Sequence, residues 1–148
     1  MKKIITKSKE ETILLGKRLA KLLKPGMIIL LNGELGAGKT CFTKGIAQGL
    51  NIKDVVNSPT FNILKVYEGD IVLYHIDAYR LEGLNQDLGF EEEIYGDGIT
   101  VIEWPEYIEQ LYKDASYLYI NITVDEDMKR TFEFSSNDKI YDYISEEL

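Results

Sequence analysis

The residues best suited to do chemistry lie in one short stretch, Gly33-Glu34-Leu35-Gly36-Ala37-Gly38-Lys39-Thr40. It matches the pattern G-x-x-x-x-G-K-[ST], whose glycines let backbone N–H groups approach a chain of phosphates. Lys39 can bridge the outer phosphates, the Thr40 hydroxyl can bind Mg²⁺, and a helix starting here adds the positive end of its dipole. The pattern predicts a nucleotide site contacted by Glu34, Leu35, Gly36, Ala37, Gly38, Lys39, Thr40 and the next residue, Cys41.

Two carboxylates are candidates for the acidic group that such a loop needs at the end of a neighbouring strand. Glu103 ends the apolar run Ile99–Ile102, and Asp77 ends the run Ile71–Ile76. The surroundings of Asp77, His75-Ile76-Asp77-Ala78-Tyr79-Arg80-Leu81, could equally form a structural corner of ion pairs and hydrogen bonds. The predicted catalytic residues are Lys39, Asp77 and Glu103, and the predicted metal ligands are Thr40 and Glu103.

A third candidate element is the segment Asn57-Ser58-Pro59-Thr60-Phe61, which is predicted to be a loop with an exposed hydroxyl group. In switch-type nucleotidases such a loop brings a threonine to the terminal phosphate and the metal. Thr60 is therefore a predicted cofactor contact, and an ordinary turn is the alternative.

The elements that must position these groups follow from the hydrophobic pattern. Met27–Leu31 is a continuous apolar run between breakers, which is typical of a strand buried on both faces of a parallel sheet. A helix is expected over Lys39–Leu50, and another behind the capping sequence Ser8-Lys9-Glu10-Glu11, ending at about Leu23. Further strands are expected at Lys2–Lys7 (at a sheet edge), Phe61–Tyr67, Ile71–Ile76, Ile99–Glu103, Tyr117–Val124 and Lys129–Phe134. Helical segments are expected within Leu84–Tyr95, at Pro105–Leu111, and after a cap at Ser136 or Asn137.

Strands mixed with helices predict an α/β fold, a three-layer sandwich of the P-loop NTPase type with a mixed, partly antiparallel central sheet. The chain of 148 residues, 45 % of them apolar, fits a single domain over residues 1–148. No apolar run is long enough for a membrane span or a secretory signal, so we expect a soluble, cytoplasmic protein.

Charge and rare residues narrow the classes further. The formal net charge is −8 and only three arginines are present, Arg18, Arg80 and Arg130. Autonomous nucleic-acid binding is disfavoured, because it rests largely on neutralising phosphates. A single cysteine and a single histidine exclude internal disulfides, Cys-rich zinc sites and His-cluster metal sites.

Taken in order, four motifs resemble the TsaE (YjeE) family, the bacterial ATPase of tRNA threonylcarbamoyladenosine synthesis. They are Gly33–Thr40, Ser58-Pro59-Thr60-Phe61, His75–Leu81 and Ile102-Glu103-Trp104-Pro105-Glu106, and the resemblance covers nearly the whole chain. It implies binding of ATP and Mg²⁺, slow hydrolysis of ATP alone, and docking on a complex of TsaB and TsaD. That complex modifies adenosine 37 of tRNAs that read codons beginning with A, so tRNA would be met indirectly, through the partners.

The resemblance also assigns residues. The family lysine and threonine match Lys39 and Thr40, the Glu-Trp pair matches Glu103 and Trp104, and the acid of H-x-D matches Asp77. Trp104 and Arg130 are thereby expected near the nucleotide. Family loops often continue G-K-T-T, whereas this chain has Cys41 in the last position.

Two other functions compete with the ATPase. A small-molecule P-loop kinase is disfavoured, because clamping two anionic substrates usually takes more arginines than the three present. A nucleotide-gated assembly module with negligible turnover would use the same loop and stays an alternative.

Overall fold

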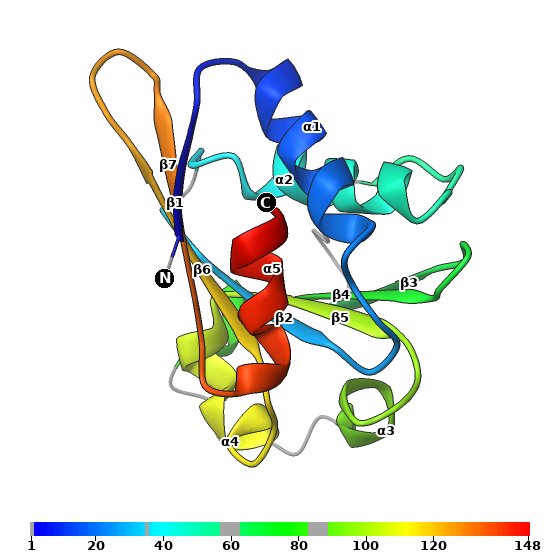
Figure 1. The fold of residues 1–148 in the computed structure, drawn as a ribbon. Helices are drawn as coiled ribbons and strands as arrows, with labels where there is room; N and C mark the ends of the chain where they lie inside the picture. Colours follow the sequence, from blue (N-terminus) through cyan, green and yellow to red (C-terminus); the bar gives the residue numbers. More distant parts are fainter. Residues whose placement is uncertain (1, 35, 57–62, 83–88) are drawn as a thin grey trace.

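The computed structural model describes residues 2–34, 36–56, 63–82 and 89–148. Its centre is a seven-stranded sheet in the order β1-β7-β6-β2-β5-β4-β3 (Figure 1). The strands are β1 (Lys2–Thr6), β2 (Ile28–Asn32), β3 (Leu64–Tyr67), β4 (Leu73–Asp77), β5 (Ile99–Glu103), β6 (Leu118–Val124) and β7 (Arg130–Ser136).

The middle of the sheet is parallel and its edges are antiparallel. β2 pairs in parallel with β5 on one side and β6 on the other, and β5 pairs in parallel with β4. The hairpins β3–β4 and β6–β7 and the edge strand β1 add antiparallel pairs. The central position of β2 in the sheet explains its apolar run, because a central parallel strand is covered on both faces. The mixed sheet predicted from the sequence is confirmed.

Helices cover the two faces of the sheet and make the three layers (Figure 1). On one face pack α1 (Lys9–Ala20), α2 (Lys39–Gly49) and the C-terminal pair of 3₁₀ helix Lys139–Tyr141 and α5 (Asp142–Glu147). The other face carries a smaller core under 3₁₀ helix Tyr79–Leu81, α3 (Glu91–Ile94), 3₁₀ helix Pro105–Ile108 and α4 (Glu109–Tyr112).

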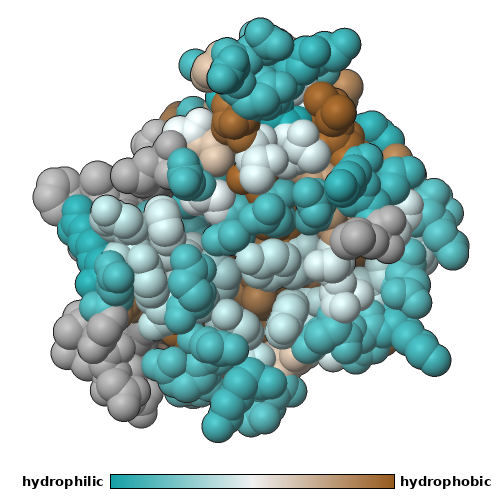
Figure 2. Space-filling model, turned by 90° about the vertical axis from the view of Figure 1, so that its left-hand side faces the viewer, coloured by the Kyte–Doolittle hydropathy of each residue, from teal (hydrophilic) through white to brown (hydrophobic). Residues whose placement is uncertain are grey.

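On the β1, β7 and β6 side, one face of the sheet is less covered than the other. Buried and part-exposed residues alternate along β6 and β7, as they do in antiparallel strands with a single packed face. Figure 2 views the molecule from this side and shows a mainly hydrophilic surface with small, separate hydrophobic groups. Ile5 of β1 is one of the exposed hydrophobic residues of the chain.

The first helix, α1, begins where the sequence predicted and ends slightly earlier than predicted. The Ser8 hydroxyl accepts a hydrogen bond from Glu11 N at 3.1 Å, as in a capping box, but the Glu11 carboxylate accepts from Lys7 N rather than from Ser8 N. The helix ends at Ala20 instead of about Leu23, because the amides of Leu22 and Leu23 turn back to carbonyls three residues earlier.

Other boundaries differ more. The segment predicted as one short helix from Pro105 is a 3₁₀ turn followed by α4. The last helical segment is capped by Asp138, whose side chain accepts from Ile140 N, and not by Ser136 or Asn137. Within Leu84–Tyr95, α3 is the helical part of the described residues, and the start of the predicted strand Phe61–Tyr67 lies outside them. In the described part of the chain, no helix has both the length and the apolar character to cross a membrane.

Candidate functional site

The glycine-rich loop joins the end of β2 to the start of α2, as the pattern predicted. Gly36 and Gly38 have φ angles of +82° and +103°, in the left-handed region that side chains disfavour. Ala37 N donates to Glu34 O at 3.0 Å, which closes the loop, and Phe42 N donates to Gly38 O as the helix begins. These two residues need to be glycine because the turn that carries the chain from strand to helix requires those angles.

Arg130, at the start of β7, braces this loop. Its Nε donates to the Ala37 carbonyl at 3.1 Å, and the side chain is only 9 % exposed. A Cβ placed on Gly38 would lie 2.8 Å from the same Nε. The guanidinium therefore packs against the loop backbone, so the residue expected near the nucleotide supports the loop that would hold it.

Lys39 has an unusual environment for a charged side chain. It is 6 % exposed, and its Nζ has no hydrogen-bond partner among the described residues. Nζ lies 4.1 Å from the centre of the Trp104 ring and 3.9 Å from Oε1 of Glu103. Burial lowers the pKa of Lys39 below its ordinary value of 10.5, although Glu103 and Asp77 act to raise it. An ammonium group without hydrogen bonds is ready to donate to an anion.

Strand register brings both predicted carboxylates to this place. Glu103 is opposite Leu31 of β2 on one side and opposite Asp77 of β4 on the other. Glu103 is 3 % exposed, and its Oε2 lies 2.5 Å from Nε2 of His75. The half-buried Asp77 accepts a hydrogen bond from Tyr79 N at 3.0 Å. The structure thus gathers Lys39, Glu103 and Asp77 at the carboxyl ends of neighbouring strands.

Trp104 follows Glu103 with a φ of +56°, which is rare for a non-glycine residue. Its ring packs between two tyrosines, with centroid distances of 5.0 Å to Tyr79 and 5.8 Å to Tyr107. This packing holds the strained backbone, and it turns the indole toward the Lys39 side of the loop.

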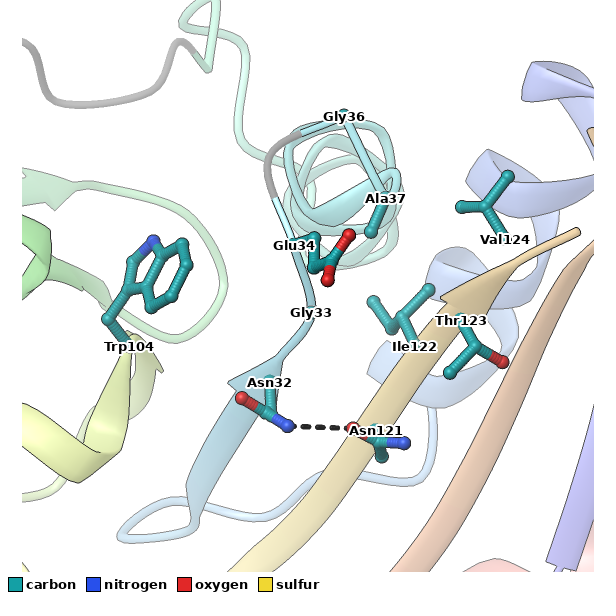
Figure 3. A pocket seen from close by; sticks show the side chains of 10 residues that line it. All are labelled: Asn32, Gly33, Glu34, Gly36, Ala37, Trp104, Asn121, Ile122, Thr123 and Val124. Carbon is teal, nitrogen blue, oxygen red and sulfur yellow. Dashed lines mark hydrogen bonds between the residues drawn. The ribbon is translucent and has the colours of Figure 1, made fainter.

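Beside the loop lies a cavity of ≈ 550 Å³, drawn in Figure 3. Trp104 stands on one side of the loop and the end of β6 on the other, with Asn32 Nδ2 donating to Asn121 Oδ1 at 2.7 Å between the strands. The residues that line the cavity are Asn32, Gly33, Glu34, Gly36, Ala37, Trp104, Asn121, Ile122, Thr123 and Val124. The β6 residues and Asn32 were not predicted, because their only signal was a place at a strand end.

The remaining predicted residues fall partly within the described structure. Thr40 and Cys41 are half-buried in the first turn of α2. Leu35 and Thr60 lie outside the described residues. Within the described ranges, no three His, Cys, Asp or Glu side chains cluster as a metal site. Thr40 and Glu103 could hold Mg²⁺ only together with other ligands, which is how Mg²⁺ commonly binds beside phosphates and water.

Comparisons with known proteins find relatives along almost the whole chain. A family model described as "Threonylcarbamoyl adenosine biosynthesis protein TsaE" matches residues 6–132. The Bacillus subtilis "tRNA threonylcarbamoyladenosine biosynthesis protein TsaE" is 43 % identical over 145 residues, which are 97 % of this chain and 90 % of that protein. The chain belongs to the TsaE family. The TsaE protein of Treponema pallidum is 45 % identical over 106 residues, 70 % of this chain and 78 % of that protein.

The TsaE family also accounts for the fold. The crystal structure of YdiB from Bacillus subtilis superimposes with a TM-score of 0.82 at 36 % identity, covering 98 % of this chain and 91 % of that one. The segment matched by the TsaE model includes the loop, Asp77, Glu103 and Arg130, so the whole gathered site lies within it. Membership supports the role in tRNA threonylcarbamoyladenosine biosynthesis that the motifs predicted.

Proposed function

We propose that the protein is a Mg²⁺-dependent ATPase, slow by itself, that is required for threonylcarbamoyl modification of adenosine 37 in tRNAs reading codons that begin with A. The observation that carries the ATPase part is the Lys39 ammonium, buried at the end of a glycine-rich loop with no hydrogen bond to any residue that the structure describes. Burying an ammonium that makes no hydrogen bond is costly, and Glu103 Oε1 at 3.9 Å lies beyond hydrogen-bond distance, so the site favours an anion that can accept from Lys39. Phosphate oxygens have this chemistry, and the following helix favours negative charge as well.

The residues of the site have distinct roles in this proposal. Lys39 and the loop amides donate to the phosphates and stabilise the charge that spreads over the transferred group. Thr40 and Glu103 would hold Mg²⁺, which neutralises further phosphate charge when it is bound. Asp77 or Glu103 would orient the attacking or metal-bound water.

Family membership and net charge motivate a proposal about the partners. We propose that the protein acts through a TsaB–TsaD complex and that tRNA is held by these partners. A formal net charge of −8 supports this division, because tRNA binding by this chain alone would need a basic face.

The test is reconstitution with TsaB, TsaD and tRNA over several turnovers, comparing the wild type with Lys39→Ala. We expect Lys39→Ala to abolish ATP hydrolysis and tRNA modification while the protein stays folded by circular dichroism. Lys113→Ala is the matched control, since Lys113 is exposed and far along the chain from the loop.

Each alternative outcome is informative. Hydrolysis retained in Lys39→Ala would contradict the assignment of the loop. Phosphate release at background in the complete wild-type system, with ATP still driving assembly, would point to a nucleotide-gated module. A phosphorylated metabolite would point to a kinase.

A further inference from the structure

His75 is a buried titratable residue that the proposed roles leave unused. It lies on β4, is 0 % exposed, and is the only histidine of the chain. Imidazoles are seldom fully buried without a polar partner. We therefore expect His75 to have a polar partner in the core, and that partner indicates what the imidazole does.

The contact is with one specific oxygen of Glu103. His75 Nε2 lies 2.5 Å from Oε2, while the other carboxylate oxygen, Oε1, lies 3.9 Å from Nζ of Lys39. His75 is opposite Val101 in the parallel pair, so Glu103 is its diagonal neighbour on the same face of the sheet. The two oxygens of Glu103 are thus divided between two partners.

This division has a consequence for Lys39. A buried carboxylate free to rotate would turn both oxygens toward the nearest cation and hold it with charge-assisted hydrogen bonds. Here the 3.9 Å distance from Glu103 leaves the ammonium without a hydrogen bond among the described residues. The imidazole keeps one oxygen away and leaves Lys39 available.

We propose that His75 is a positioning residue: its Nε2–H holds Glu103 so that one oxygen faces the loop and Lys39 stays free to donate. The proposal rests on the proposed function for its kinetic consequences. Partners that orient a ligating or catalytic side chain typically change affinity or activity by about 10–100-fold when removed.

The experiment compares three variants. His75→Leu has a similar volume and no donor. His75→Gln places an amide N–H at the same reach as Nε2, and His75→Asn keeps a polar group that stops short of Glu103. All are first checked for folding by circular dichroism and thermal melting, and His75→Asn serves if the leucine variant fails to fold.

The first readout needs no nucleotide. Trp104 is the only tryptophan, and the Lys39 ammonium lies over its ring, so its fluorescence reports the position of Lys39. In His75→Leu we expect Glu103 to draw Lys39 away and the Trp104 emission to change, whereas His75→Gln keeps the wild-type spectrum. Identical emission in the wild type and in both donor-deficient variants would overturn the proposal.

The second readout is kinetic. His75→Leu should lower kcat for ATP hydrolysis by about 10-fold or more, keep KM for ATP within about threefold, and weaken Mn²⁺ binding measured with ADP present. His75→Gln should restore each value. Equal losses in His75→Leu and His75→Gln would mean that a hydrogen-bond donor at this position does not restore the site, and would overturn the proposal. A wild type that hydrolyses no ATP would refute the proposed function, while the fluorescence result would still decide the role of His75.

Discussion

Gly38 is the residue at which the loop has least freedom. Its φ of +103° disfavours any side chain, and Arg130 occupies the space where a Cβ would go. Gly36 has a φ of +82°, but a Cβ added there would meet nothing within 4 Å. A side chain at Gly36 would therefore strain the backbone without displacing a neighbour. The two glycines separate the cost of backbone conformation from the cost of displacing Arg130.

We expect Gly36→Ala to lower the free energy of unfolding by about 1–2 kcal/mol, from backbone strain alone. Gly38→Ala should cost about 1–3 kcal/mol more, because Arg130 must leave the Ala37 carbonyl. Urea unfolding of both variants measures the difference. Equal losses of unfolding free energy in the two variants would show that Arg130 moves at no cost. As a control, adding Arg130→Ala to Gly38→Ala should remove most of the additional loss that Gly38→Ala causes.

At the scale of elements, the packing of α1 on α2 sets where the loop ends. The two helices approach so closely that a Cβ on Gly45 would lie 2.1 Å from Ile13 O, and one on Gly16 would lie 2.4 Å from Phe42 O. Both contacts are with backbone, which cannot turn aside as a flexible side chain can. The start of α2, which carries Lys39, is therefore located by a glycine-lined contact between two helices.

Gly45→Ala should destabilise the protein by about 3 kcal/mol, since the helices must separate to admit the methyl group. Gln48→Ala on the same helix is the control, because Gln48 is exposed and its loss should stay within about 0.5 kcal/mol. Chemical denaturation gives both values. A change below that of the control would mean that the helices are not held at this distance in solution.

At the scale of the whole molecule, the C-terminal segment ties the two halves of the sheet together. The buried Tyr141 hydroxyl accepts from Ile28 N at 3.0 Å and donates to Ser116 O at 3.0 Å. Ile28 begins the strand that leads to the loop, and Ser116 precedes β6, which lines the cavity. Burial raises the pKa of Tyr141, so the hydroxyl stays protonated and able to donate.

Tyr141→Phe should lower the free energy of unfolding by about 2 kcal/mol, because it leaves the Ile28 amide and the Ser116 carbonyl without this partner. Nucleotide affinity should stay unchanged, since Ile28 is at the opposite end of β2 from the loop. Tyr95→Phe removes a hydroxyl from a half-exposed ring, where it donates a single hydrogen bond of 3.3 Å to Leu111 O, and should cost about 0.5 kcal/mol or less. Thermal melting of the two variants checks the contrast, and an equal shift in both would contradict it.

The sequence by itself determined the features that depend on neighbours along the chain. The glycine pattern of Gly33–Thr40 specifies the loop because its backbone angles are local, and the apolar runs at β2 and β5 specify buried strands. The carboxylates Asp77 and Glu103 could be named in advance because each ends such a run.

Only the tertiary structure decided which of these groups meet. Strand order sets β5 and β6 on the two sides of β2, and register then puts Glu103 beside Lys39 and Asn121 beside Asn32. His75 gained its role from a diagonal contact across two strands, and Arg130 became a brace of the loop from 93 residues away. Such pairings depend on which strands become neighbours. The packing of the whole sheet determines those neighbours, and no local pattern of residues predicts them.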